Sequence, residues 1–221
     1  MSQLFWRQGY RQVKLITTLN RDTKSTGHLI LSPGQAYEIN FGEDIVKIFL
    51  ENGFAVEDRG FCSHKFFEQF IANDTLFIIL IKSHWKWDEN YRIMTKRGSV
   101  RVVCLSSMEN KVDNYLATHI PEEVMSHEEI GEAYRQRWAI EVLWKFLKMH
   151  LKLDKMMNKS LHEITIQIYV ILIIYLILQL LKAPQMYGSK LVDKLRYIQI
   201  VIRQEWHFVH WLHRVVPRLN M

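Results

Sequence analysis

The segment from Ser126 to Leu153 constrains the fold more than any other part of the sequence. Its apolar residues recur at helical spacing, and Ser126 is followed three residues later by Glu129. That pair is typical of a capping box, in which two side chains satisfy free backbone N–H groups of the first helical turn. The sequence therefore predicts one helix that begins at Ser126 and continues to Leu153.

Charged residues of this expected helix gather on one side. At about 100° per residue, four of them share a stripe roughly 80° wide: Arg137, Glu141, Lys145 and Lys148. Most of the remaining circumference, Val142 included, is apolar and predicts burial. A lone carboxylate in a core costs on the order of several kcal/mol, so the stripe should face a polar cleft or a charged ligand. The pattern indicates a functional site.

A simpler interpretation is also open. The cations lie four residues before, four after and seven after Glu141, so they can form ion pairs along an exposed helix surface. Each such pair is worth about 0.2–0.5 kcal/mol. On the pattern alone, a surface ladder of charges remains an alternative to a site.

The same residues resemble a known family. Tyr134, Arg137, Glu141 and Lys148 have the spacing Tyr-x2-Arg-x3-Glu-x6-Lys of the IS-four family of bacterial insertion-sequence transposases, which are DDE transposases with a ribonuclease-H-like core. The surrounding sequence, YRQRWAIEVLWKFLKMHLKL, is similar to the family's glutamate helix. The resemblance implies that Glu141 binds metal, and that Tyr134, Arg137 and Lys148 hold phosphates of the transposon end. It assigns no role to Lys145.

A second match lies around Asp58. Residues 54–57 read as a short strand, and Asp58 follows where it ends, which is the position at which α/β sheets collect functional groups. The segment GFAVEDRGFCSHKFF resembles the part of the family that carries its second catalytic Asp, and this implies that Asp58 is a metal ligand. Taken alone, Asp-Arg-Gly is more typical of a turn with a surface ion pair.

The remaining pattern predicts a mixed α/β fold. We expect a hairpin formed by residues 12–19 and 28–31, helices at 44–52 and 64–72, and a central strand at 75–81. Three strand-like runs then form an antiparallel β insert at about 83–123. By resemblance, residues 1–221 are part of one catalytic domain with a ribonuclease-H-like sheet flanked by helices, this insert and a helical C-terminal part. Trp85 and Trp87 in the insert could stack on bases or belong to an amphipathic strand.

Residues 161–181 form the most hydrophobic stretch. Eighteen of them, ITIQIYVILIIYLILQLL, just reach the length of a membrane span. Gln167 and Gln179 interrupt the stretch, however, and a helix that is apolar all round can be the centre of a globular core. The sequence predicts a buried helix of a soluble protein without a membrane partner, with a single-span membrane protein as the alternative.

Composition permits a nucleic-acid partner. The net charge is +6, a modest basic excess. Two cysteines, Cys62 and Cys104, do not make a disulfide framework, which is typical of a reduced, cytoplasmic protein, and both are expected in the core. The resemblance implies double-stranded DNA as the partner, at transposon terminal repeats and at the target, with a homodimer on DNA and association with the nucleoid. The C-terminal histidines 207, 210 and 213 are expected on the surface rather than in a metal site.

The resemblance also implies a two-metal reaction. Ribonuclease-H-like enzymes cut and join phosphodiesters with Mg²⁺ or Mn²⁺ held by carboxylates, because these hard cations take oxygen ligands. Asp58 and Glu141 are two of the family's three carboxylates. In relatives the first lies shortly before a segment like LFWRQGYRQVKL, which begins here almost at Met1, so we expect a truncated chain. Asp22, in a turn, and Asp44, at a helix start, are poor replacements, and a DNA-binding remnant without chemistry is the alternative.

Overall fold

The chain forms two compact units, which are Met1–Gly34 with Val142–Met221, and Gln35–Glu141. The structure is a computed structural model that describes residues 2–5, 12–20, 22–33, 41–48, 54–82, 84–105, 114–157 and 160–203. Each unit combines a β-sheet with helices. The predicted mixed α/β class is therefore confirmed.

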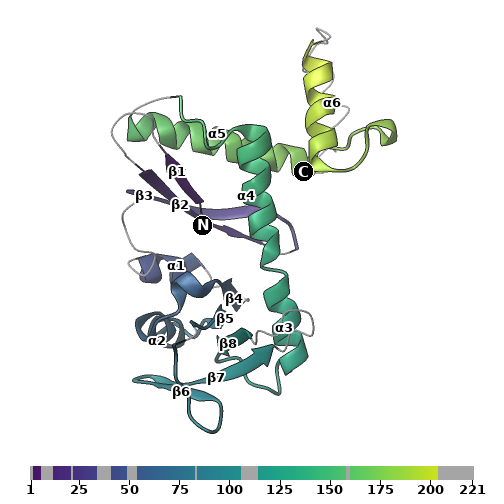
Figure 1. Ribbon diagram of the computed structural model, residues 1–221. Helices are drawn as coiled ribbons and strands as arrows, with labels where there is room; N and C mark the ends of the chain where they lie inside the picture. The colour runs from purple at the N-terminus through teal and green to yellow at the C-terminus, as the bar shows by residue number, and fades with distance from the viewer. Residues whose placement is uncertain are drawn as a thin grey trace, which may run out of the picture. The chain divides into compact units, whose positions relative to one another are not determined.

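The unit Gln35–Glu141 is built on a five-stranded sheet (Figure 1). Its strands follow the order β4 (Phe54–Glu57), β5 (Leu76–Leu80), β8 (Asn114–Thr118), β7 (Gly98–Leu105) and β6 (Arg92–Thr95). β4 and β5 are parallel, and every other pair of neighbours is antiparallel. The three strands of the expected β insert, β6, β7 and β8, thus extend this sheet, because β8 pairs with β5. The edge strand of the same sheet, β4, ends at Glu57, directly before Asp58.

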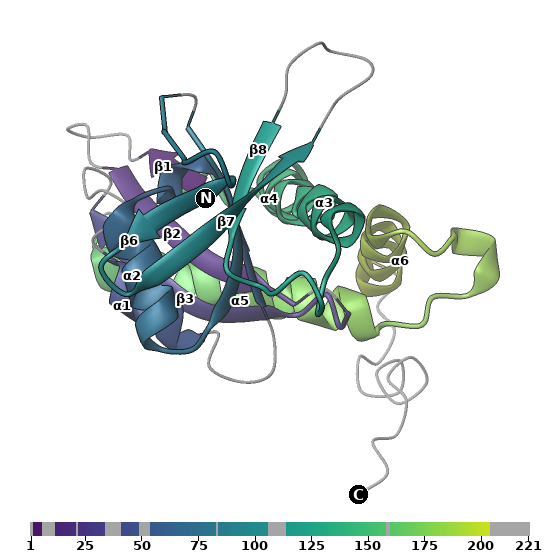
Figure 2. The same ribbon diagram turned by 90° about the horizontal axis from the view of Figure 1, so that it is seen from below.

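Helices cover both faces of this sheet, as Figure 2 shows. On one face lies α2 (His64–Ala72), against which α1 (Gly42–Ile48) packs, and on the other lies α3 (His127–Arg135). Side chains alternate along a strand, so Phe77 of β5 meets Phe67 and Phe70 of α2, with ring centroids 5.3 and 5.2 Å apart. Ile78 instead joins the core cluster beneath α3. The continuously apolar β5 is buried from both sides, as its sequence predicts.

The segment predicted as one helix forms two. α3 begins with the expected capping box of Ser126 and Glu129 and ends at Arg135, and α4 runs from Trp138 to Leu151. Between them the backbone tightens: the N–H of Arg137 donates to the Tyr134 carbonyl at 3.0 Å, and the N–H of Ile140 donates to Arg137 at 3.1 Å. These bonds span three residues, as in a 3₁₀ turn. The break therefore keeps the chain hydrogen-bonded and falls at a predicted site residue.

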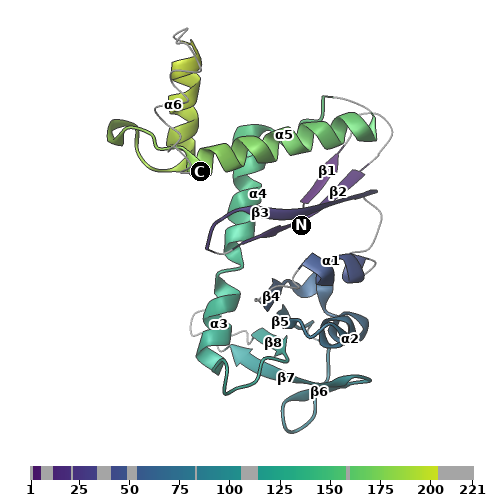
Figure 3. The ribbon, with the colours of Figure 1, turned by 180° about the vertical axis from the view of Figure 1, so that it is seen from behind.

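The other unit contains the predicted hairpin. β1 (Ser2–Phe5), β2 (Gln12–Leu19) and β3 (Thr26–Pro33) form an antiparallel sheet in that order. Asn20 begins the turn between β2 and β3 because its side-chain oxygen accepts from the N–H groups of the residues two and three positions later, both at 2.9 Å. α5 (Leu161–Leu180) packs along β3 (Figure 3). The Tyr175 hydroxyl donates to the Lys24 carbonyl at 2.9 Å and ties the helix to the hairpin turn.

A further helix, α6 (Leu191–Arg203), docks on the end of α5 after a short 3₁₀ turn, η3 (Gln185–Tyr187). The Lys194 ammonium donates to the carbonyls of Leu178 and Gln179 at 3.0 and 3.3 Å. Such a cation satisfies the free carbonyls that a helix leaves at its C-terminal end. The expected helical C-terminal part is present to Arg203, and histidines 207, 210 and 213 lie outside the described residues.

Two expectations about burial need correction. Only one face of α5 is in the core, because seven other large apolar residues of the helix are exposed. By length and composition alone, α5 could cross a membrane. About a third of its most apolar 18-residue stretch is buried inside the protein. Cys62 is buried as predicted, but Cys104, the second-last residue of β7, is exposed.

Candidate functional site

Asp58 occupies the expected position at the end of β4. It caps the short 3₁₀ helix η2 (Arg59–Phe61), and its Oδ1 accepts a hydrogen bond from the Gly60 N–H at 2.8 Å. The neighbouring Ala55 is fully buried in the sheet, whereas Asp58 itself is half-buried. The strand end and the cap together hold one carboxylate oxygen. Within the part of the chain that the structure describes, Oδ2 has no hydrogen-bond partner.

Tyr134, on the last turn of α3, lies within electrostatic reach of Asp58. Its ring packs against the core cluster under α3. Burial raises the pKa of Tyr134; Arg137 lowers this pKa, and the charge of Asp58 raises it further. Asp58 and Tyr134, which are distant in sequence, are thus brought together by the fold.

Arg137 connects Tyr134 to Glu141. One guanidinium nitrogen donates to Glu141 Oε1 at 2.7 Å, and the guanidinium lies over the Tyr134 ring, 5.5 Å from its centroid. The side chains of Arg137 and Glu141 are 21% and 39% exposed, so the pair is partly shielded from water. Burial works to lower the pKa of Arg137, but the hydrogen bond to Glu141 and the field of Tyr134 raise it on balance. The ion pair of the surface-ladder interpretation therefore exists, in a partly buried setting.

Glu57 is a titratable residue beside the site that the sequence analysis did not single out. It is the last residue of β4 and directly precedes Asp58. Burial, and then the charge of Asp58, raise the pKa of Glu57 to about 8, and Arg137 opposes the shift. Its position beside Asp58 was visible in the sequence, but nothing there indicated that the fold would raise its pKa.

The remaining cations of the stripe follow on α4. Lys145 is exposed and Lys148 is half-buried, and both belong to the part of α4 that lies in the other unit. Seven residues along an α-helix correspond to about 10 Å, which separates Lys148 from Glu141 along the axis. Val142, which the sequence predicts to be buried, is 53% exposed. The flank of α4 beside the stripe is therefore open to solvent as well.

Two comparisons place these residues in a family. Residues 5–177 match the family described as the transposase DDE domain. Over 227 aligned residues the chain is 35% identical to a protein of Synechocystis sp. described as "Putative transposase for insertion sequence element IS4SA", covering 98% of this chain and 67% of that protein. The chain belongs to the DDE transposases. The resemblance to the IS-four family is confirmed, and the fold is consistent with the ribonuclease-H-like core of this transposase family.

A DDE transposase is an enzyme that acts on DNA with divalent metal ions, and the residues of this chain offer a partial oxygen donor set. Asp58 and Glu141 each have one carboxylate oxygen engaged in the hydrogen bonds above and one without a partner among the described residues. Oxygen donors of this kind suit Mg²⁺ or Mn²⁺. The described ranges contain no group of three His, Cys, Asp or Glu residues that could hold a metal. Asp22 is exposed in the β2–β3 turn and Asp44 in the first turn of α1.

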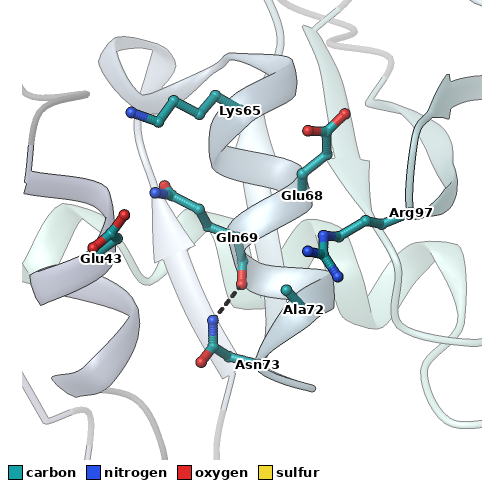
Figure 4. Close-up of a pocket in the computed structure, with 7 residues that line it drawn as sticks. All are labelled: Glu43, Lys65, Glu68, Gln69, Ala72, Asn73 and Arg97. Atoms are coloured by element: carbon teal, nitrogen blue, oxygen red, sulfur yellow. Dashed lines mark hydrogen bonds between the residues drawn. The ribbon is translucent and has the colours of Figure 1, made fainter.

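Two hollows of the sheet unit lie elsewhere. A cleft of about 410 Å³ has the lining residues drawn in Figure 4, where Asn73 Nδ2 donates to the Gln69 carbonyl at 2.8 Å. A second, of about 270 Å³, includes Arg101 and His119. Neither contains Asp58 or Glu141. The candidate site is thus a group of side chains around a strand end and a helix break.

Trp85 and Trp87 both have partners inside the fold. The Trp85 ring stacks on the His64 ring of α2, with centroids 4.6 Å apart, and its centroid lies 5.2 Å from that of Phe67. The ring centroids of Trp87 and Tyr115 of β8 are 4.7 Å apart. Of the two interpretations left open by the sequence, these contacts favour a packing role. Both side chains are half-buried.

Proposed function

We propose that this chain carries the metal-dependent chemistry of an insertion-sequence transposase, the cleavage and strand transfer of phosphodiester bonds at transposon ends. The observation that supports this is the connection of Asp58, Tyr134, Arg137 and Glu141 within one unit. The domain assignment, one partial catalytic domain over 1–221 with a β insert at about 83–123, is part of the proposal.

The side chains of the site have two different proposed roles, metal binding and the positioning of the metal ligands. Asp58 and Glu141 would hold Mg²⁺ or Mn²⁺, which when bound polarises the phosphate and activates the attacking hydroxyl. The Gly60 N–H fixes the orientation of Asp58, and Arg137 fixes that of Glu141. Arg137 also places a positive charge directly beside the Glu141 carboxylate. The carboxylates would thus meet the metal already oriented.

Tyr134, Arg137 and Lys148 are the proposed DNA contacts. A guanidinium and an ammonium bind phosphate oxygens by charge and hydrogen bonding, without reading the base sequence. The partner is double-stranded DNA, at the terminal repeats and at the target, with the protein as a homodimer on DNA. We place this protein in the cytoplasm, associated with the nucleoid. A membrane location is less favoured, because the apolar α5 buries one face against the hairpin sheet.

Loss of either cation should weaken DNA binding without changing sequence preference. We expect Arg137→Ala and Lys148→Ala each to lower the slope of log K against log salt by about one counterion, since each phosphate contact releases about one. The measurement is a salt titration of binding to duplex DNA with the transposon end. Arg137→Gln is the milder variant, because glutamine can still donate to Glu141.

Lys190→Ala is the matched control for that titration. It removes one positive charge at an exposed position before α6 and should leave the slope unchanged. If both test variants keep the parent slope, Arg137 and Lys148 form only intramolecular ion pairs, and the surface-ladder interpretation holds.

The proposed chemistry requires a third metal-binding carboxylate, and a cleavage assay can test whether this chain supplies it. We propose that it is neither Asp22 nor Asp44, because they lie in a turn and at a helix start, and because the described residues contain no group of three that could hold a metal. The experiment compares cleavage of end DNA, with Mg²⁺ or Mn²⁺, by the 221-residue chain and by a version extended upstream. We expect cleavage by the extended version and at least about 1000-fold less by the chain alone, which corresponds to about 4 kcal/mol of lost transition-state stabilisation.

Each outcome of that comparison decides something. Equal cleavage by both versions, abolished in both by Asp58→Ala, would mean that a residue of this chain is the third ligand. Specific DNA binding without cleavage by either version would favour the DNA-binding remnant instead.

A further inference from the structure

One face of α5 is apolar and exposed. Six large residues on it are between 41% and 67% exposed: Ile166, Tyr169, Val170, Ile173, Ile177 and Leu180. At about 100° per residue they occupy an arc of roughly 100°, opposite the residues that α5 buries against the hairpin sheet. An apolar stripe of this length on a soluble protein usually marks an interaction surface. We call these six residues the α5 stripe.

The α5 stripe is close to symmetric about its own middle. Ile166 and Leu180 lie seven residues before and after Ile173, and Tyr169 and Ile177 lie four residues before and after it. An antiparallel copy of the same helix, related by a two-fold axis at Ile173, would therefore set large apolar side chains opposite large apolar side chains along the stripe. A two-fold interface requires this self-complementarity, in which residue i meets residue j and j meets i.

The charges at the two ends fit the same arrangement. Glu163 is exposed at the N-terminal end of α5 and Lys182 is exposed just after its C-terminal end. These two residues are ten before and nine after Ile173, so an antiparallel pair brings each Glu163 near the other copy's Lys182 at both ends. A parallel pair would instead place like charges together. Complementary charges at the rim fix the register and orientation of an interface.

We propose that the α5 stripe is a self-association surface on which α5 of a second copy packs antiparallel, with the two-fold axis at Ile173. The inference deepens and rests on the homodimer of the proposed function, for which it names the surface. It needs neither DNA nor metal. Ridges and grooves of two such helices interlock at an axial separation of about 8–10 Å.

The apolar side chains of the α5 stripe would also suit two other partners. A lipid bilayer would accept α5, since its length and composition pass the test for a span. Another part of a longer chain could also cover it. Neither is favoured by the end charges, which have their complement in a second copy.

Cysteine cross-linking distinguishes these cases. In a chain with Cys104→Ser, so that only the buried Cys62 remains, we introduce Ile173→Cys. At a helix separation of about 8–10 Å and a helix radius of about 2.3 Å, the two Cα atoms at the axis are about 5 Å apart, within disulfide range. We expect mild oxidation to link most of the protein as dimer. Ile166→Cys alone should not self-link, because its two copies would lie about 21 Å apart along the axis.

One mixture and one control variant complete the test. Ile166→Cys mixed with Leu180→Cys should link as a heterodimer, whereas Met186→Cys, a highly exposed position outside α5, is the control for random collision. Self-linking of Ile166→Cys would show parallel pairing and overturn the proposed register. Absence of linking at Ile173 in a folded protein, or recovery of the protein only with membranes, would overturn the proposal itself.

Ile173→Glu gives a second readout without cross-linking. It places two carboxylates at the two-fold axis, so we expect the dimer dissociation constant to rise about 100-fold or more by sedimentation equilibrium. Glu163→Lys should weaken the dimer less, and Lys182→Glu in the same chain should restore it. Because the assay contains no DNA, a monomer that still binds transposon-end DNA would refute only this surface, whereas a dimer that does not bind transposon-end DNA would refute only the proposed function.

Discussion

Asp58→Asn and Glu141→Gln are each expected to lower transposon-end cleavage at least about 1000-fold, which corresponds to about 4 kcal/mol in the activation barrier. Each change removes one negative charge from an expected metal ligand, and a neutral amide oxygen is a much weaker donor to a hard cation than a carboxylate. Cleavage is measured with Mg²⁺ in the version of the protein that contains the third carboxylate. In the 221-residue chain, the corresponding readout is weaker binding of Mn²⁺.

Both substitutions are designed to leave the fold intact. An asparagine side chain can still accept from the Gly60 N–H, and a glutamine side chain can still accept from Arg137. The matched control is Glu128→Gln, the same change on the exposed first turn of α3. A variant that keeps cleavage within about tenfold of the parent would remove that residue from the metal site. A fall in the unfolding temperature would instead point to a structural role.

The parts of the fold that the sequence predicted are those with local causes. Ser63 accepts from the Phe66 N–H at 3.1 Å and begins α2 where its cap pattern indicated. β4 spans Phe54–Glu57 as predicted, since a short apolar run before Asp-Arg-Gly leaves few alternatives. The hairpin of β2 and β3 follows from alternation and from the turn chemistry of Asn20. In each case the signal lies within a few residues of its effect.

Two features could not be predicted because their causes are not local. The helix break at Gln136 and Arg137 interrupts a sequence with good helical periodicity, and no Gly or Pro lies at the break, so intrinsic propensity gave no signal there. The apolar α5 looked buried all round because composition does not show which face meets the sheet. Helix faces are assigned by packing, and packing depends on segments far away in the sequence.

The site shows the same division. The pairing of Arg137 with Glu141 could be predicted from their spacing of four residues. That Asp58 influences Tyr134, and that the pKa of Glu57 is raised beside Asp58, depends on β4 and α3 belonging to one unit. The family likeness supplied those relations in advance for Asp58, because family motifs carry tertiary information. It supplied nothing for Glu57.

Phe77→Ala is expected to be the most destabilising single substitution in the sheet unit. Phe77 is fully buried in β5 between Phe67 and Phe70 of α2, and it also contacts His119 at 4.8 Å. Removing a buried phenyl ring costs about 3–5 kcal/mol through lost transfer free energy and the remaining cavity. That is a large part of the roughly 5–15 kcal/mol that stabilises a typical domain.

The effect of Phe77→Ala should reach the candidate site, because Phe77 pairs with Ala55 of β4 three residues before Asp58. We therefore expect the urea midpoint, followed by far-UV circular dichroism, to fall, and Mn²⁺ binding by Asp58 to weaken with it. Phe77→Leu keeps most of the volume and should cost less than about 1.5 kcal/mol. Met94→Ala is the control, because it removes an apolar side chain from an exposed position of β6 instead of from the core. If Phe77→Ala and Met94→Ala shift the midpoint equally, α2 does not depend on β5 for its packing, and the strand end at Asp58 must be held by the sheet alone.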